Sequence, residues 1–186
     1  MVACLNPNLV LVGFMGTGKS TIGRRCARAL SFRFVDTDML VERRAGTSIV
    51  RIFAQQGEAA FRAMEREAVR ESAARVHVVI ATGGGVVLDA ENVRLLRQSG
   101  IVVWLQVSPE EIARRCRNTA TRPLLAEAEN PLERIRRMLE VRVPYYEAAA
   151  DAVVETTGVT HREAALRVLE AYRQEAARWT GCRQPE

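Results

Sequence analysis

Lysine is nearly absent from this chain of 186 residues. Lysine and arginine together number 27, and reading the sequence shows that Lys19 is the single lysine while the other 26 are arginine. Because nearly every positive charge is an arginine, a retained lysine indicates a site that needs a compact ammonium group rather than a planar guanidinium group. An arginine-rich composition with one incidental lysine would give the same count, so the residues around Lys19 must decide between the two.

The chain also lacks closely spaced cysteines and long apolar runs. Cys4, Cys26, Cys116 and Cys182 show no C-x-x-C spacing, which argues against a zinc site and indicates reduced thiols. No apolar run reaches the roughly 18 residues of a membrane-spanning helix, and the polar residues 6–8 interrupt the region where a signal peptide would be apolar. We therefore expect a cytoplasmic protein without a membrane partner.

The net charge of +5 raises the question of a nucleic-acid partner. Along stretches such as residues 65–75 the arginines alternate with glutamates, which predicts solvated helix surfaces instead. Residues 114–142 are the exception, with eight arginines and four glutamates, but no aromatic residue interrupts this run before Tyr145. We expect no nucleic-acid partner, and because the chain has no long heptad pattern we expect a monomer.

Five short apolar runs predict β-strands. They lie at residues 9–12, 32–35, 76–81, 101–107 and 152–154. Each run is followed by turn or cap residues and then by a helical pattern, and continuous apolar strands are typical of a sheet buried on both faces. The pattern predicts an α/β fold, a three-layer α/β/α sandwich with a five-stranded parallel sheet. We expect a single domain over residues 1–186, with a core at about 9–175 and a frayed tail at about 180–186.

Helix starts are marked by capping residues. Ser48 precedes a helix over residues 49–56, Ser108 and Pro109 open another, and Asn130 opens a stretch that reaches Tyr146. Proline lacks the N–H that a helix interior needs, so Pro144 predicts a kink or the end of this last helix near residue 143.

Residues 13–20 form a phosphate-binding motif. They match G-x-x-x-x-G-K-[ST] and lie between the strand at 9–12 and a helical run at 21–30, which is the context that the motif requires. Backbone N–H groups would converge on an anion, Lys19 would reach the β- and γ-phosphates, and Ser20 would offer a hydroxyl to Mg²⁺. The candidate nucleotide-binding residues are Gly16, Thr17, Gly18, Lys19, Ser20 and Thr21.

Two carboxylates follow the strand at 32–35. Asp36 and Asp38 would lie at the carboxyl edge of the sheet, where open α/β proteins bind ligands, and strand alternation would place both on one side. Alternatively, Asp38 only caps a helix over residues 39–45. The spacing alone supports both interpretations.

Two further features favour a binding site. Arg62 follows Glu58 by four residues, so the pair could be an ordinary surface ion pair of a helix. Residues 82–85 read Thr-Gly-Gly-Gly directly after a predicted strand, and consecutive glycines are most useful where a ligand approaches the backbone. We interpret this segment as a binding loop rather than a simple turn.

Together these residues resemble the shikimate kinases, P-loop kinases of the nucleoside-monophosphate-kinase-like group. The resemblance runs from about residue 9 to residue 169, and its ordered motifs are more specific than the P-loop. The motifs are D-T-D at 36–38, G-x-S-I-x-x-I-F at 46–53, G-E-x-x-F-R at 57–62, T-G-G-G at 82–85, T-R-P-L-L at 121–125 and R-x-P-x-Y at 142–146. The resemblance implies transfer of the γ-phosphate of ATP to the 3-hydroxyl of shikimate, in the route to chorismate and the aromatic amino acids.

The resemblance also implies which residues hold the acceptor. Asp38, Arg62, Gly84 and Arg142 would bind shikimate, with both arginines on its carboxylate and Asp38 on its ring hydroxyls. Asp38 would orient the attacking hydroxyl and accept its proton. Lys19 would join it in catalysis by neutralising phosphate charge.

Other roles implied by the resemblance concern the nucleotide. Asp36 would lie in the water shell of Mg²⁺ opposite Ser20, and Arg122 would fold over the ATP phosphates from a lid at about residues 118–130 as a third catalytic residue. Arg115 would stack on adenine. Residues 155–160 depart from the family pattern, so adenine contacts there would be made by the backbone.

Two alternative functions remain open on the sequence. Two arginines placed for a carboxylate also suit a sugar acid, as in a gluconate kinase, although the D-T-D and T-G-G-G motifs disfavour it. A nucleotide-binding module without catalysis is the other alternative. It would have no evident need for Asp36, Asp38, Arg62, Arg122 and Arg142 together.

Overall fold

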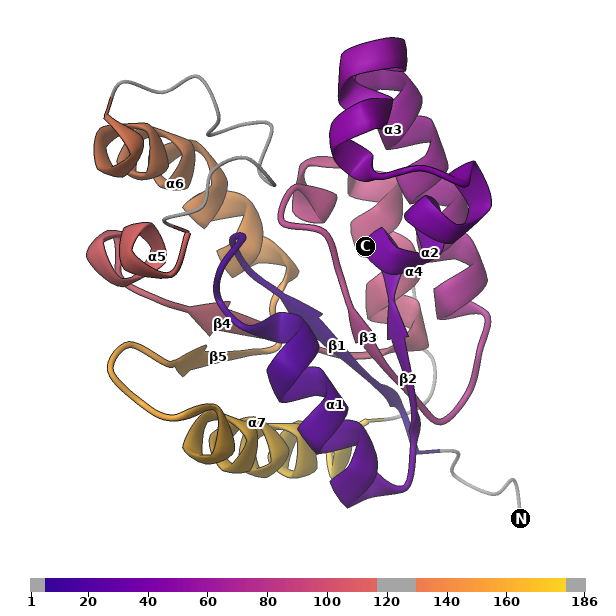
Figure 1. The fold of residues 1–186 in the computed structure, drawn as a ribbon. Helices are drawn as coiled ribbons and strands as arrows, with labels where there is room; N and C mark the ends of the chain where they lie inside the picture. Colours follow the sequence, from indigo (N-terminus) through magenta and orange to yellow (C-terminus); the bar gives the residue numbers. More distant parts are fainter. Residues whose placement is uncertain (1–5, 117–129, 180–186) are drawn as a thin grey trace.

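The computed structural model describes residues 6–116 and 130–179, and in these residues five strands form one sheet (Figure 1). The strand order is β2-β3-β1-β4-β5 and every neighbouring pair is parallel. The strands are β1 Asn8–Val12, β2 Arg33–Asp36, β3 Val78–Ala81, β4 Gly100–Gln106 and β5 Ala152–Glu155. The predicted five-stranded parallel sheet is therefore confirmed, and no strand end differs from its expected position by more than two residues.

Helices cover both faces of the sheet. They are α1 Lys19–Leu30, α2 Thr37–Ala45, α3 Ile49–Ala73, α4 Ala90–Ser99, α5 Pro109–Arg115, α6 Pro131–Ala149 and α7 His161–Ala176, with a short 3₁₀ turn η1 Val86–Leu88. Figure 1 shows α1 and α7 lying next to each other on one side of the sheet, in agreement with their direct contact. Residues of α3, α4 and α6 pack on the other face. This arrangement confirms the predicted three-layer sandwich.

Strand β1 explains why the sheet is apolar on both faces. Leu9 and Leu11 pack with residues of α1 and α7, whereas Val10 and Val12 pack with residues of α3, α4 and α6. All four side chains are buried, and successive strand residues point to opposite faces. A continuous apolar run is therefore what a central strand of this sandwich requires.

The candidate site lies at the carboxyl ends of three neighbouring strands. β1 leads into the P-loop, β2 into α2, and β3 into the Thr-Gly-Gly-Gly loop, and these strands adjoin in the order β2-β3-β1. Because parallel strands end at the same edge, the three segments meet there although they are far apart in the sequence.

Of the two effects expected of Pro144, a kink or the end of its helix, the end near residue 143 is wrong. α6 continues through Pro144 to Ala149. A proline inside a helix costs about 3 kcal/mol, so the packing of the last turn must outweigh this penalty. Tyr146 lies in that turn, is fully buried, and stacks on Trp104 with ring centroids 5.5 Å apart. Tertiary contacts therefore outweigh the local effect of Pro144 on the helix.

Two other helix predictions need adjustment. The helix predicted at 49–56 continues past Gly57 as the single element α3, which carries a kink at Gly57 with φ of 80°. α1 begins at Lys19 rather than at residue 21.

Within the described residues, no helix is both long enough and apolar enough to cross a membrane.

Replacing Tyr146 with phenylalanine is expected to lower the free energy of unfolding by about 1 kcal/mol, the usual value of one buried hydrogen bond. The Tyr146 hydroxyl donates to the backbone carbonyl of Gly84 at 2.5 Å, and burial raises its pKa far above the usual value. Urea denaturation would measure the change. The matched control is Tyr145→Phe, because Tyr145 is 48% exposed. An equal loss in both variants would contradict a specific role for this bond.

Candidate functional site

The P-loop holds Lys19 in a buried position. Its ammonium group donates to the carbonyl of Gly13 at 2.7 Å and to the carbonyl of Phe14 at 2.8 Å, and the residue is only 8% exposed. Gly16 and Gly18 have φ of 78° and 89°, in the left-handed region that other residues rarely adopt. The motif glycines are thus required by the loop conformation, and the loop wraps around the single lysine of the chain.

A pocket of about 330 Å³ opens above this loop. Its lining includes Gly16, Gly18, Lys19, Ser20 and Thr21, five of the six predicted nucleotide-binding residues. The first turn of α1 points its free N–H groups at this space, which suits an anion. The sixth, Thr17, is buried and donates through its hydroxyl to the carbonyl of Phe14 at 2.8 Å. Thr17 therefore stabilises the loop from beneath.

Ser20 and Asp36 lie together at the rim of this pocket. The Ser20 hydroxyl donates to the Asp36 carboxylate at 2.6 Å. A hydroxyl beside a carboxylate supplies the oxygen ligands that Mg²⁺ prefers, and Mg²⁺ usually takes only one or two of these from protein while water and phosphate complete its shell. The two residues predicted for magnesium are thus brought together in a suitable arrangement.

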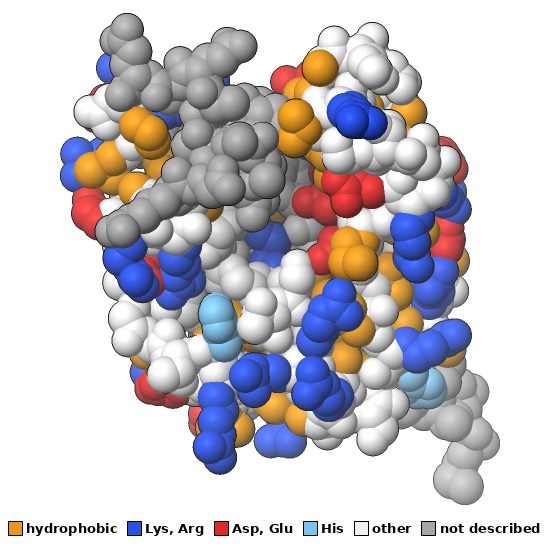
Figure 2. All heavy atoms as spheres, viewed as in Figure 1, with side chains coloured by type: hydrophobic (Ala, Val, Ile, Leu, Met, Phe, Trp, Pro, Cys, Tyr) orange, Lys and Arg blue, Asp and Glu red, His pale blue; other side chains and the backbone are white. Residues whose placement is uncertain are grey.

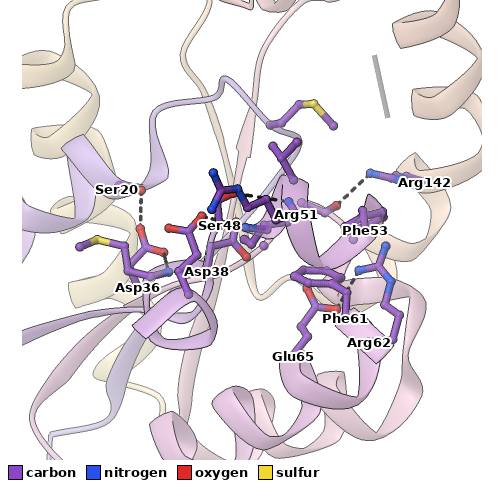
Figure 3. A pocket seen from close by; sticks show the side chains of 18 residues that line it. Ser20, Asp36, Asp38, Ser48, Arg51, Phe53, Phe61, Arg62, Glu65 and Arg142 are labelled. Carbon is purple, nitrogen blue, oxygen red and sulfur yellow. Dashed lines mark hydrogen bonds and ion pairs between the residues drawn. The ribbon is translucent and has the colours of Figure 1, made fainter. Parts of the chain in front are cut away.

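Asp38 lies on a helix rather than on a strand. α2 begins at Thr37, and its N-cap is Asp36, whose carboxylate accepts from the N–H of Met39 at 3.2 Å. The interpretation of Asp38 as the cap is therefore wrong, and so is the argument from strand alternation. Asp38 instead projects from the first turn of α2 into the cavity shown in Figure 3. It also lines the P-loop pocket.

A side chain on Gly83 or Gly85 of the Thr-Gly-Gly-Gly loop would displace charged groups from their present positions. A Cβ atom on Gly83 would lie 2.6 Å from Oε1 of Glu65 and 2.7 Å from Oδ1 of Asp38. A Cβ on Gly85 would lie 2.7 Å from the terminal nitrogens of Arg62. The glycines thus let the charged side chains approach the main chain, which supports the interpretation as a binding loop.

Arg62 makes more contacts than the predicted surface pair. It bonds to Oε1 of Glu58 through Nε at 3.2 Å and Nη2 at 2.8 Å, and to Glu65 through Nη1 at 2.8 Å. Burial alone would lower the pKa of Arg62, but its ion pairs with Glu65 and Glu58 raise it above the usual value. Burial raises the pKa of the Glu65 carboxyl, and Arg62 opposes this rise. The guanidinium is therefore held in a fixed orientation.

Arg142 approaches the same cavity from α6. It is 7% exposed and donates from Nη1 to the carbonyl of Gly84 at 3.3 Å, the oxygen that also accepts from Tyr146. Arg142 and Arg62 line a cavity of about 690 Å³ together with Asp38 and Gly84 (Figure 3). The four residues predicted to bind the acceptor therefore surround one space. On the face drawn in Figure 2, acidic side chains gather beside a hollow, while basic ones spread over the region of α1 and α7.

Arg115 connects α5 to the P-loop. Its guanidinium donates to the carbonyls of Gly16 and Thr156, each at 3.5 Å, and to Glu111 at 2.8 Å. Hydrogen bonds from Arg114 and Arg115 lower the pKa of Glu111 to about 2. A second pocket of about 440 Å³ lies here, lined by residues of α5 and by 158–161, next to the P-loop pocket. Stacking of Arg115 on adenine stays a prediction.

One predicted site residue lies outside the described part of the chain, and three pocket residues were not predicted. Arg122 and nearly all of the expected lid at 118–130 lie outside the described residues. Conversely, no role was predicted from the sequence for Glu65, Arg51 or His161. Glu65 and Arg51 line the cavity of about 690 Å³, and His161 lines both the P-loop pocket and the pocket beside α5. Only Glu65 had a signal, its spacing of three from Arg62 on a helix.

Comparisons with known proteins agree with this geometry. The family model described as "Shikimate kinase" matches residues 15–173. A shikimate kinase of Caldanaerobacter subterraneus subsp. tengcongensis is 47% identical over 165 residues, which cover 89% of this chain and 95% of that relative. The solved shikimate kinase from Acinetobacter baumannii in complex with shikimate has a TM-score of 0.87 and 38% identity, covering 91% of this chain and 94% of that one.

A gluconokinase structure provides a contrast. The enzyme from Sinorhizobium meliloti aligns with a TM-score of 0.58 and 17% identity, covering 94% of this chain and 96% of that one. At this identity the likeness shows a shared fold and nothing about the acceptor. The match of the family model and the 47% identity over most of both chains place the sequence more narrowly: the chain belongs to the shikimate kinase family.

Proposed function

We propose that this chain transfers the γ-phosphate of ATP to the 3-hydroxyl of shikimate, giving shikimate 3-phosphate and ADP. Membership of the family makes it an ATP-dependent kinase. The observation that carries the proposal is that the P-loop pocket and the acceptor cavity share lining residues, among them Ser20, Asp36 and Asp38. Donor and acceptor would meet where these pockets join.

Asp38 has the position that the reaction requires. It lines both pockets, so its carboxylate can orient an acceptor hydroxyl toward a phosphate held over the P-loop and accept the proton as the new O–P bond forms. Phosphoryl transfer depends mainly on alignment and on neutralisation of charge. Lys19 supplies one positive charge at the loop, and Arg122 is proposed to supply another.

Magnesium is proposed as the accompanying cation. Bound at Ser20 and Asp36, it would neutralise phosphate charge. The hydrogen bond of 2.6 Å between these two side chains supports this proposal, because it holds their oxygens close to each other. We also propose that the chain acts as a monomeric single-domain kinase in the cytoplasm, with no nucleic-acid partner. Cys26 and Cys116, the cysteines of the described residues, are both buried.

Replacing Arg62 with alanine is expected to raise the KM for shikimate by about 30-fold to 1,000-fold, the usual range for one partner of a buried charge pair. Arg62 has five N–H donors, and three of them bind Glu58 and Glu65. One N–H on each terminal nitrogen is left over, and these two donors can bind a carboxylate. Arg66→Ala on the exposed side of α3 is the control. An unchanged KM would refute the assignment of Arg62 to the carboxylate.

A coupled assay of ADP release tests the function itself. The purified chain would be given ATP and Mg²⁺ with shikimate, gluconate or a nucleoside monophosphate as the acceptor. The proposal requires stimulation by shikimate alone. Stimulation by gluconate would support the sugar-acid alternative, and no stimulation by any acceptor would support a nucleotide-binding module.

A further inference from the structure

Arg51 is a cation of the acceptor cavity that the motifs leave without a role. It lies in the first turn of α3, is exposed to solvent, and lines the cavity that also holds Asp38, Arg62 and Arg142 (Figure 3). Its backbone N–H donates to the hydroxyl of Ser48 at 3.4 Å. Within residues 6–116 and 130–179, its guanidinium has no hydrogen-bond or ion-pair partner.

The charges that line the cavity indicate why the guanidinium of Arg51, unpaired in the described residues, is important. Three arginines line it, Arg51, Arg62 and Arg142, against the four carboxylates of Asp36, Asp38, Glu42 and Glu65. Arg62 already binds two carboxylates and Arg142 donates to a backbone carbonyl. Arg51 is therefore the cavity cation whose donors are least committed within the described part of the chain. An anionic acceptor entering a cavity with excess negative charge needs such a group.

The position of Arg51 in α3 is unfavourable for the helix. Ser48 is the N-cap, so residue 51 is the third helical position, where Glu or Gln completes a capping box. A positive charge there also opposes the helix dipole, which favours anions at this end. Since a positive charge at this position opposes the dipole and the side chain is exposed, neither capping nor packing explains the arginine. The positive end of the α3 dipole adds to the positive potential that Arg51 produces in the cavity.

We propose that Arg51 is a further acceptor-binding residue, which attracts the shikimate carboxylate into the cavity and sets the salt-dependent part of its affinity. This inference rests on the proposed function. A guanidinium at the rim acts mainly on encounter and ground-state binding, because it lies away from the transferred phosphate. Its removal should therefore change KM and leave kcat nearly unaltered.

The test compares Arg51→Gln, Arg51→Lys and Arg51→Glu in the coupled assay with saturating ATP. At about 20 mM salt, where screening is weak, Arg51→Gln should raise the KM for shikimate by about five- to tenfold with kcat within about twofold. Arg51→Lys should restore most of the loss, and Arg51→Glu should raise KM further. At about 300 mM salt the differences should shrink to about twofold, because the interaction is screened. Calorimetric titration with shikimate should show the same ranking of affinities.

Arg51→Glu separates binding from folding. It completes the capping box and matches the helix dipole, so its Tm should equal or exceed that of the unaltered protein while its affinity falls. The matched control is Arg173→Gln, an exposed arginine of α7 with the same loss of charge, whose KM should not change.

The possible results distinguish a failure of the role of Arg51 from a failure of the proposed function. If the unaltered protein phosphorylates shikimate but Arg51→Gln shows the same KM at both salt concentrations, Arg51 has no role in binding and the proposed function stands. If Arg173→Gln raises KM as much as Arg51→Gln, the effect is one of net charge and the inference is overturned. If the unaltered protein does not phosphorylate shikimate, the proposed function fails and the inference fails with it.

Discussion

Replacing Lys19 with arginine is expected to lower kcat by about 10²-fold to 10³-fold, the range found when one preorganised donor to a transition-state charge is lost. The substitution keeps the positive charge, so the loss would come from shape. The Lys19 ammonium sits 2.7 and 2.8 Å from two carbonyls inside the P-loop. A planar guanidinium is larger than this space and presents its donors in a fixed fork.

The measurement is steady-state kinetics of ADP release with shikimate as the acceptor. The matched control is Arg28→Lys on the exposed surface of α1, which tests whether exchanging these residue types matters elsewhere. Thermal unfolding would show whether the variant is folded. Full activity of Lys19→Arg would refute the argument that the near absence of lysine marks a site requiring an ammonium group.

Replacing Asp38 with asparagine is expected to lower kcat by about 10²-fold to 10⁴-fold, the usual contribution of a positioned proton acceptor. Asparagine has nearly the same shape and can still hydrogen-bond, but its amide does not accept a proton at neutral pH. Oδ1 of Asp38 lies where a Cβ on Gly83 would come within 2.7 Å of it, so the carboxylate occupies space next to the glycine loop. The isosteric exchange therefore isolates the charge and the basicity of the carboxylate.

Glu42→Gln provides the control for Asp38→Asn. Glu42 lines the same acceptor cavity but not the P-loop pocket, so it carries a similar charge without access to both substrates. We expect its kcat to stay within about threefold of the unaltered value, as for a residue outside the reacting atoms. Equal losses in the two variants would mean that the cavity needs negative charge in general and that Asp38 is no specific base.

The strands and the P-loop could be predicted because local sequence determines them. The apolar runs mark the central strands β1, β3 and β4, which are buried on both faces, and the glycines of the P-loop mark positions with positive φ. The end of α6 could not be predicted in this way. Continuation past Pro144 depends on the stacking of Tyr146 on Trp104, and these residues are distant in the sequence.

The residues that line the candidate site were predicted better than their geometry. Asp36 and Asp38 were expected on one side of a strand, but α2 starts at Thr37. Asp36 therefore reaches the site as the N-cap of α2, and Asp38 reaches it from the first turn of that helix. The buried partner of Arg62 was not identified either. Burial of Glu65 depends on the approach of the glycine loop to α3, which no local pattern encodes.

The carbonyl of Gly84 limits how the acceptor can use this residue. A carbonyl oxygen has two lone pairs, and here Arg142 and Tyr146 donate to the oxygen from two directions. No acceptor capacity is left for a hydroxyl of the ligand while α6 keeps both contacts. Any hydrogen bond between Gly84 and shikimate must therefore come from the peptide N–H, with a hydroxyl or carboxylate oxygen of the ligand as the acceptor. Gly84 would recognise the lone pairs of the ligand rather than its protons.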